Sequence, residues 1–251
     1  MTNHPTNLTF CAAALSLSLV GVANAGVVAH WSFDADFTDS SASSNDLSVG
    51  SGTPTITTAA GESKFGGGAV DLDYDGDWLT TASTISFGPA DPWSVSFWGK
   101  KDAGVDARSG MVVGTSATNN FIWTPDNSNV VQGLRFRPGG GGSFDYGGFA
   151  DDAQYHHWVV VADGTGTIRV YRDNVDLGTL VAPTDFSIDS VGSGLASTTN
   201  NYGGQLDEIY IFDQAIDAQT VASLFTSNVV PEPGSLALIG LGGVLALRRR
   251  R

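Results

Sequence analysis

Residues 93–97 read Trp-Ser-Val-Ser-Phe, a strict alternation of large apolar and small polar side chains. Because successive side chains of a β-strand point to opposite faces, this pattern predicts a strand with one buried and one polar face. Leu134 and Phe136 alternate with Arg135 and Arg137 in the same way. Both stretches indicate strands of antiparallel sheets, which often pack against a core on one side only.

Short runs of this kind recur along the chain, separated by stretches rich in Gly, Ser, Thr and Asn. We expect further strands at Val27–Phe33, Gly68–Tyr74, Gly110–Gly114, Asn120–Trp123, Gly133–Arg137, His157–Ala162, Thr167–Arg172 and Gln205–Phe212. One short helix is predicted after Asp217, which can cap it, and Val221, Leu224 and Phe225 give this helix an apolar stripe. Regular strands without a long helical period predict an all-β, antiparallel two-sheet sandwich or jelly roll.

The composition is acidic and almost free of cysteine. With 26 Asp and Glu residues against 12 Lys and Arg residues, the formal net charge is −14 at pH 7. Such a surface repels nucleic acids and anionic lipids, so we expect no nucleic-acid partner. Cys11 is the only cysteine and lies in an N-terminal apolar run. The region that follows this run therefore has no disulfide and no thiol chemistry.

Residues 1–25 have the pattern of a secretory signal peptide. An apolar run over residues 11–22 precedes the sequence Ala-Asn-Ala at residues 23–25, which is an A-x-A cleavage site. We therefore expect export by the general secretion machinery and a mature chain that begins at Gly26.

Residues 228–251 combine a proline motif, a short apolar run and a block of four arginines, in that order. The motif is Pro231-Glu232-Pro233, the apolar run is Leu236–Leu247, and the arginines are Arg248, Arg249, Arg250 and Arg251. The prolines stop a preceding helix and keep the chain extended. The apolar run prefers lipid, and the arginines resist translocation and stay on the cytoplasmic side.

This tail resembles the PEP-CTERM sorting signal of Gram-negative bacteria. The resemblance implies transient insertion into the inner membrane, cleavage near the Pro-Glu-Pro motif by an exosortase, and transfer to the cell surface or extracellular matrix. A permanent membrane anchor is the alternative. The 13 residues from Ser235 to Leu247 would span only about 20 Å as a helix at ~1.5 Å per residue, whereas a hydrocarbon core is about 30 Å thick. The short run therefore favours a sorting signal.

Five segments between residues 26 and 227 resemble, in order, the LamG-like jelly-roll family of the concanavalin A-like lectin/glucanase fold. They are His30-Trp31-Ser32-Phe33-Asp34, Phe65–Asp73, Tyr155–Val160, Ile168–Asn174 and Gly204–Phe212. The resemblance implies one domain of two antiparallel sheets with about five to seven strands each. The family usually has Asp-Gly where this chain has Asp173-Asn174, but Asn also accepts a positive φ, so we expect the hairpin to be kept.

The resemblance also implies a structural calcium ion between Asp34 and Asp207, with backbone carbonyls near Ser44–Asn45 completing the shell. The residues themselves place Asp207 in phase with Ile209 and Ile211 on the strand. A carboxylate on an apolar face needs a partner, because burial of an unpaired charge is costly. A calcium ion is one such partner. The alternative is that Asp34 caps a turn and that Asp207 accepts backbone hydrogen bonds.

Two further groups of possible ligands favour a structural interpretation. Residues 71–77 begin like the calcium loop of an EF-hand, but Ala82 stands where that loop needs a bidentate Glu. Their alternation predicts a strand that runs into a turn. His156 and His157 are adjacent, so on a strand they point to opposite faces and cannot chelate one metal ion as a pair.

The sequence favours binding over catalysis. Trp123, Tyr146 and Tyr202 lie in or beside Gly- or Asn-rich stretches, where they can either stack on sugars or pack against the rim of the sandwich. Glycoside hydrolases of this fold use a Glu-x-Asp-x-x-Glu or similar motif, which this chain lacks. We expect an exported, non-catalytic surface or matrix protein that is carbohydrate-binding or structural in the extracellular polysaccharide matrix, with no ligand-binding residue identified. A pure adhesion or structural protein and a glycoside hydrolase are the alternatives.

Overall fold

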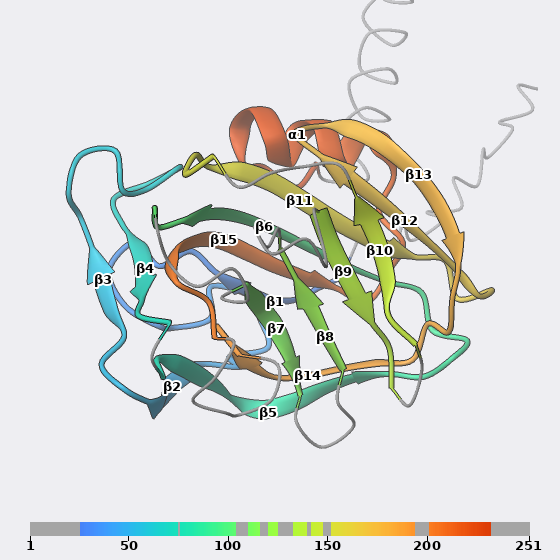
Figure 1. The fold of residues 1–251 in the computed structure, drawn as a ribbon. Helices are drawn as coiled ribbons and strands as arrows, with labels where there is room; N and C mark the ends of the chain where they lie inside the picture. Colours follow the sequence, from blue (N-terminus) through green and yellow to red (C-terminus); the bar gives the residue numbers. More distant parts are fainter. Residues whose placement is uncertain are drawn as a thin grey trace, which may run out of the picture.

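The computed structural model describes residues 26–74, 76–103, 110–115, 120–124, 133–139, 142–147, 152–193 and 201–231. Within these ranges the chain forms two antiparallel sheets that face each other, with a single α-helix on the outside (Figure 1). The predicted signal peptide, Glu232, Pro233, the apolar run and the terminal arginines lie outside the described residues.

Sheet A has eight strands in the order β13-β12-β11-β6-β15-β4-β3, with β1 also paired to β15. Their bounds are Val27–Trp31 (β1), Thr55–Thr57 (β3), Ala69–Leu72 (β4), Trp93–Lys101 (β6), His156–Ala162 (β11), Thr167–Arg172 (β12), Val175–Val181 (β13) and Gly204–Phe212 (β15). The sheet has one strand more than expected, because β15 pairs with β4 through Gly204–Leu206 and with β1 through Ile209–Phe212.

Sheet B has seven strands in the order β10-β9-β8-β7-β14-β5-β2. Their bounds are Leu47–Ser51 (β2), Trp78–Phe87 (β5), Met111–Thr115 (β7), Asn120–Trp123 (β8), Gly133–Arg137 (β9), Phe144–Gly147 (β10) and Phe186–Val191 (β14). The strands β7 to β10 follow one another in the chain and form one half of this sheet. Figure 1 shows β7 to β10 side by side.

The core fills the space between the sheets. Trp93, Val95 and Phe97 are fully buried in it, as the pattern at residues 93–97 predicts, but Ser94 and Ser96 of the polar face are buried as well. Trp93 stacks on Phe186 of sheet B with 4.9 Å between ring centroids. Burial of aromatic side chains of this size contributes most to the stability of a sandwich, which holds together here without a disulfide.

Helix α1 (Ala218–Ser227) packs on the outer face of sheet A. As predicted, Asp217 is its N-cap and accepts the backbone N–H of Thr220 at 2.8 Å. Val221 and Leu224 are buried in a second apolar cluster against Tyr210 and other residues of the sheet. The helix therefore covers the outer face of sheet A. The outer face of sheet B lies on the opposite side of the sandwich.

The nine strands that the alternating patterns predict are all present, three of them with the predicted bounds. The strands that the patterns missed are β2, β3, β5, β10, β13 and β14. β13 is an edge strand on which Val175 and Val181 are exposed, so its side chains show no clear alternation. The predicted hairpin at Asp173-Asn174 is confirmed, since both residues have positive φ, 49° and 64°.

Candidate functional site

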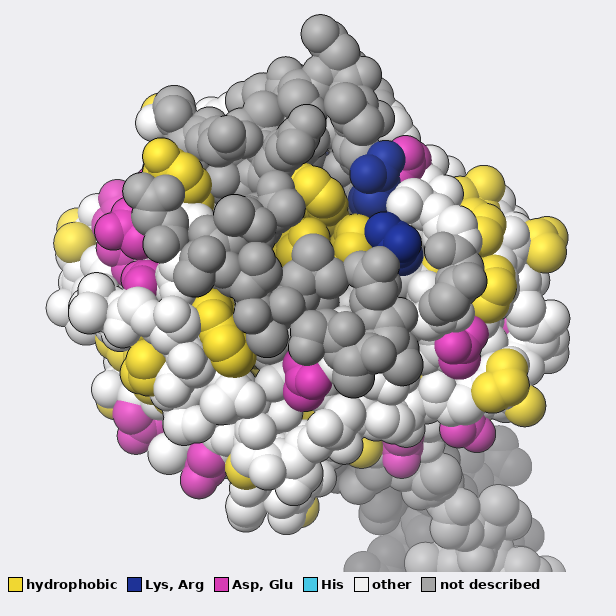
Figure 2. All heavy atoms as spheres, turned by 60° about the horizontal axis from the view of Figure 1, so that its bottom comes forward, with side chains coloured by type: hydrophobic (Ala, Val, Ile, Leu, Met, Phe, Trp, Pro, Cys, Tyr) yellow, Lys and Arg dark blue, Asp and Glu magenta, His cyan; other side chains and the backbone are white. Residues whose placement is uncertain are grey.

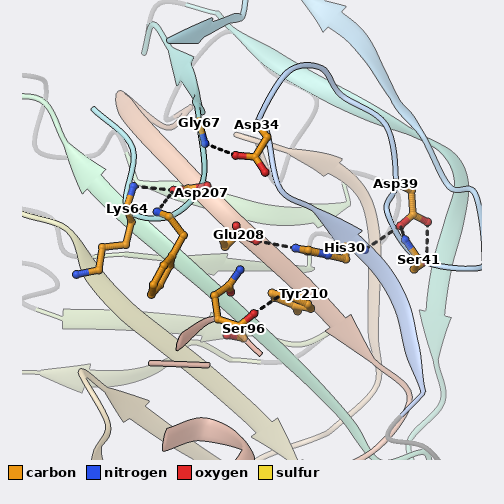
Figure 3. A network of polar contacts seen from close by, with 12 residues as sticks. His30, Asp34, Asp39, Ser41, Lys64, Gly67, Ser96, Asp207, Glu208 and Tyr210 are labelled. Atoms are coloured by element: carbon orange, nitrogen blue, oxygen red, sulfur yellow. Dashed lines mark hydrogen bonds and ion pairs between the residues drawn. The ribbon is translucent and has the colours of Figure 1, made fainter. Parts of the chain in front are cut away.

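Two carboxylates hold the loop between β3 and β4 (Figure 3). Asp207 lies in β15, and its Oδ2 accepts the backbone N–H groups of Lys64 at 2.7 Å and of Phe65 at 3.0 Å. Asp34 follows β1, and its Oδ1 accepts the N–H of Gly67. Asp207 therefore has the backbone-binding role that the sequence left open as the alternative to calcium, and Asp34 binds the backbone of the same loop. We call these five residues the Asp207 corner.

The loop depends on a glycine beside Asp34. Gly66 has a φ of +59°, and an added Cβ would lie 1.8 Å from Oδ1 of Asp34. A larger residue there would be strained in its backbone and would collide with the carboxylate. The Gly-rich stretch after Phe65 is therefore explained by the close approach of Asp34.

Asp207 does not share a face with Ile209 and Ile211, so this expectation was wrong. A β-bulge shifts the register between Asp207 and Tyr210, and Glu208 has a φ of +50°. The extra residue reverses the alternation, as bulges do. Ile209 and Ile211 point into the main core, whereas Asp207 lies opposite Trp98, outside that core. A period-two pattern does not reveal such a bulge.

The Asp207 carboxyl carries one oxygen that nothing satisfies. Its Oδ1 is buried and has no hydrogen-bond partner in the described part of the chain. Burial, with smaller contributions from the charges of Glu208 and Asp34, raises the pKa of Asp207 to about 7, although the two backbone hydrogen bonds lower it. An unpaired oxygen on a buried carboxyl fits either a retained proton or a cation.

The calcium ligands expected besides Asp34 and Asp207 are backbone carbonyls near Ser44–Asn45. The carbonyl of Asn45 accepts the indole N–H of Trp31 at 3.0 Å. Among the described residues, no group of three or more His, Cys, Asp or Glu side chains is placed to hold a metal ion. The calcium ion between Asp34 and Asp207 therefore stays a prediction.

A third acidic residue beside this corner was not expected. Glu208 is buried, and its Oε2 lies 2.6 Å from Nε2 of His30. The ring of His30 stacks on Tyr210 with 3.8 Å between centroids (Figure 3). These contacts depend on the bulge, which turns Glu208 towards β1.

The outer face of sheet B carries a second group of side chains in two rows across the strands. The Cα register places Met111 (β7), Trp123 (β8), Arg135 (β9) and Asp145 (β10) in one row. The next row contains Phe121 and Arg137, which are direct partners. We call Met111, Phe121, Trp123, Arg135 and Arg137 the arginine–aromatic face.

The arginines lie over the rings of this face. The guanidinium carbon of Arg135 is 5.9 Å from a ring centroid of Trp123, and that of Arg137 is 5.6 Å from the centroid of Phe121. Arg135 is also held by a two-point ion pair, because its Nε and Nη2 donate to the oxygens of Asp145 at 2.7 and 2.8 Å. Figure 2, viewed from the side of β5 and β14, shows Lys and Arg side chains beside a hydrophobic patch.

The aromatic residues of this face form a cluster separate from the main core. Met111, Phe121 and Trp123 are 1%, 3% and 7% exposed, respectively. The indole Nε1 of Trp123 is buried and finds no acceptor among the residues that the structure describes. The rings are therefore buried, whereas Arg135 and Arg137, which lie over them, are of intermediate exposure.

The other predicted sugar-stacking residues are structural. Tyr146 and Tyr202 belong to the main core, where they are 6% and 1% exposed. The hydroxyl of Tyr146 donates to the carbonyl of Ile168 at 2.8 Å. Both residues therefore have the alternative role, which is packing within the sandwich.

The two adjacent histidines are also structural. His157 is buried against Trp98, its Nε2 lies 2.8 Å from Oγ of Ser96, and burial lowers its pKa to about 3. His156 lies between Asp173 and Asp152, and the hydrogen bond that its ring donates to Asp173 is the main cause of its raised pKa. They share no ligand set.

The start of the EF-hand-like stretch forms β4, as the alternation predicts. The side chain of Asp77 is occupied by backbone N–H groups, with Thr53 at 2.7 Å and Asp73 at 3.1 Å. Helix α1 has 10 residues, and no helix in the described ranges is both long and apolar enough to span a membrane.

Comparison with known proteins gives two family matches and several related structures. The model of the concanavalin A-like lectin/glucanases superfamily matches residues 73–222. The model of the PEP-CTERM protein-sorting motif matches residues 229–251. No curated protein matches the sequence significantly.

Solved structures with this fold have low sequence identity. Domain 4 of AbnA, a GH43 extracellular arabinanase from Geobacillus stearothermophilus, in complex with arabinotriose, has a TM-score of 0.63 at 19% identity, over 81% of this chain and 100% of that one. The binding domain of botulinum neurotoxin serotype D has a TM-score of 0.57 at 13% identity, over 80% of this chain. The same domain in complex with N-acetylneuraminic acid has a TM-score of 0.56 at 12% identity.

The alignment covers 52% and 51% of the two toxin chains, so this chain spans about half their length. At these identities the likeness concerns the fold alone. The sorting motif implies export, handling by an exosortase, and a cell-surface or extracellular destination. The chain thus belongs to the concanavalin A-like lectin/glucanases superfamily and carries a PEP-CTERM sorting motif behind its jelly-roll domain.

Proposed function

We propose that the protein is a non-catalytic carbohydrate-binding module of the cell surface or the extracellular polysaccharide matrix. The observation that carries this proposal is the arginine–aromatic face. There, two guanidinium groups lie over aromatic rings on the sheet face that α1 does not cover. Guanidinium groups donate several hydrogen bonds in a fixed plane, which suits the hydroxyl and ring oxygens of a sugar.

Two related structures support a sugar ligand. Domain 4 of the arabinanase is described with arabinotriose and the toxin domain with N-acetylneuraminic acid. A concanavalin A-like domain sent to the cell surface would meet polysaccharide there. For this chain the sugar remains a proposal.

The side chains around this face favour binding over glycoside hydrolysis. Hydrolases of this kind need two carboxyl groups across the scissile bond, one of them free to give a proton. Asp145 is held by Arg135, and Oδ2 of Asp189 accepts the hydroxyl of Thr115 at 2.5 Å. Sugar release from a polysaccharide panel would favour the hydrolase instead.

The test is equilibrium binding of the full chain to a panel of polysaccharides. We expect binding to at least one polymer, and an affinity at least about tenfold lower, or about 1.4 kcal/mol, in the double variant Phe121→Leu, Trp123→Leu. Leucine keeps the site apolar but removes the rings. Val181→Ser, at an 85% exposed position of β13, is the control. Circular dichroism checks the fold of each variant. A correctly folded chain that binds no polysaccharide would instead favour the pure adhesion or structural role.

We also propose that Asp207 and Asp34 hold a calcium ion that stabilises the fold. The unsatisfied Oδ1 of Asp207 supports this proposal. A bound ion would fix the ionised form of the carboxyl and tie β15 to the loop after β1. The change of melting temperature with calcium and with a chelator tests it.

A further inference from the structure

Arg137 differs from the other described arginines in its contacts with acidic residues. Arg135, Arg169 and Arg172 each lie close to an aspartate. Arg137 has neither an ion pair nor a hydrogen bond within the part of the chain that the structure describes. This is unusual in a protein with 26 acidic and 12 basic residues, where acceptors are plentiful.

Arg137 is also partly withdrawn from water. It lies on β9, is of intermediate exposure, and has its guanidinium over Phe121. A partly buried cation without an acceptor loses part of its hydration and gains only the ring contact in return. A ligand that supplies an anion to this position would recover that loss.

The shape of the guanidinium selects the kind of anion. It is planar and presents parallel N–H groups, which match the two oxygens of a carboxylate. Arg135 shows this geometry within the protein, because it binds the carboxylate of Asp145 through two N–H groups. A second carboxylate on Arg137 would lie in the adjacent row of the same face.

The net charge of −14 does not prevent this contact. At physiological salt, exposed charges more than about 8 Å apart are largely screened from each other. The charges of the face itself therefore dominate. Asp145 is neutralised by Arg135, and Asp189 on β14 accepts a hydrogen bond from Thr115.

We propose that the polysaccharide bound by the arginine–aromatic face is an acidic one, and that Arg137 binds the carboxylate of its uronic acid units. This inference rests on the proposed function and specifies its ligand. Arg137 makes the contact directly, and Phe121 positions the guanidinium. Arg135 keeps its ion pair with Asp145 and contacts neutral parts of the polysaccharide.

The experiment compares a uronic acid polymer with the same polymer after reduction of its carboxyl groups to alcohols. Equilibrium binding of the full chain is measured in chelator, so that no calcium ion bridges polymer and protein. We expect the acidic form to bind at least about tenfold more tightly, as for a hydrogen-bonded charge pair. Arg137→Gln should bring the two affinities together, and Arg137→Lys should keep only part of the preference.

Arg169→Gln is the matched control, because it removes the same charge from the exposed surface of β12. It should keep the full preference. Equal affinity of the wild-type protein for both polymers would overturn the inference and leave the proposed function standing. A preference that persists in Arg137→Gln would overturn it as well. Failure to bind any polysaccharide would overturn both.

Discussion

Replacement of Asp207 by Asn tests the origin of the raised pKa. Asn has nearly the same shape, and its carbonyl oxygen can accept the N–H groups of Lys64 and Phe65 as Oδ2 of Asp207 does. The variant removes the charge that burial disfavours, and its NH2 group takes the place of the unpaired Oδ1 at every pH. In chelator, we therefore expect Asp207→Asn to be more stable than the wild-type protein at pH 8. This stability advantage of the variant should be smaller at pH 4.

The magnitude follows from the pKa values. The folded protein holds a proton on Asp207 up to about pH 7, whereas an ordinary value is 3.8. The contribution of this group to stability is thus full below pH 3.8 and is lost as the pH rises to 7. About three pKa units correspond to about 4 kcal/mol. The difference in unfolding free energy between variant and wild type should change by up to about this amount between pH 4 and pH 8.

Urea denaturation at several pH values measures this difference, because contributions of groups common to both proteins cancel. With calcium at about a hundredfold above its dissociation constant, the wild-type protein should gain about 2.7 kcal/mol and Asp207→Asn much less. A difference between wild type and Asp207→Asn that is constant from pH 4 to pH 8 would refute the reasoning.

Three further predictions concern the loop and the two ends of the chain. Gly66→Ala should destabilise the protein by roughly 1–3 kcal/mol, because alanine is strained at positive φ and its Cβ would meet Asp34. Gly61 also has positive φ but lies in open space. In the same denaturation assay, Gly61→Ala therefore measures the backbone strain without the collision. Intact mass measurement of the exported protein should show Gly26 as the first residue, and peptides that contain Cys11 would contradict this. The released protein should also lack Leu236–Arg251, and replacement of Glu232 should leave uncut protein in the inner membrane fraction. A released protein that still carries the four arginines would speak for an anchor.

Nine strands were predictable because their side chains alternate, although β5 and β14, which also pack against the core, were missed. Residues 93–97 are an example, and the cap at Asp217 was equally clear from its local sequence. The edge strand β13 was not, since exposed strands are under no demand to alternate. The bulge at Glu208 was hidden for a different reason. One inserted residue reverses the phase of a strand without leaving a mark on the composition.

The candidate site illustrates the same limit. The alternation at Arg135 and Arg137 showed that both arginines leave the core, but not which residues of other strands lie beside them. That depends on the register between strands, which brings Trp123 and Phe121 next to the arginines. Register is set by tertiary packing and turn geometry, so a single sequence does not fix it.

The central claim is that polysaccharide binds on the outer face of sheet B through its arginines. The Nε–H signals of arginine side chains in nuclear magnetic resonance spectra report on it directly, once each is assigned by an Arg→Gln variant. On addition of an acidic oligosaccharide that binds, the account predicts that the signals of Arg137 and Arg135 shift and that the signal of Arg169 stays in place. Saturable binding that leaves the Arg137 and Arg135 signals unmoved would contradict it.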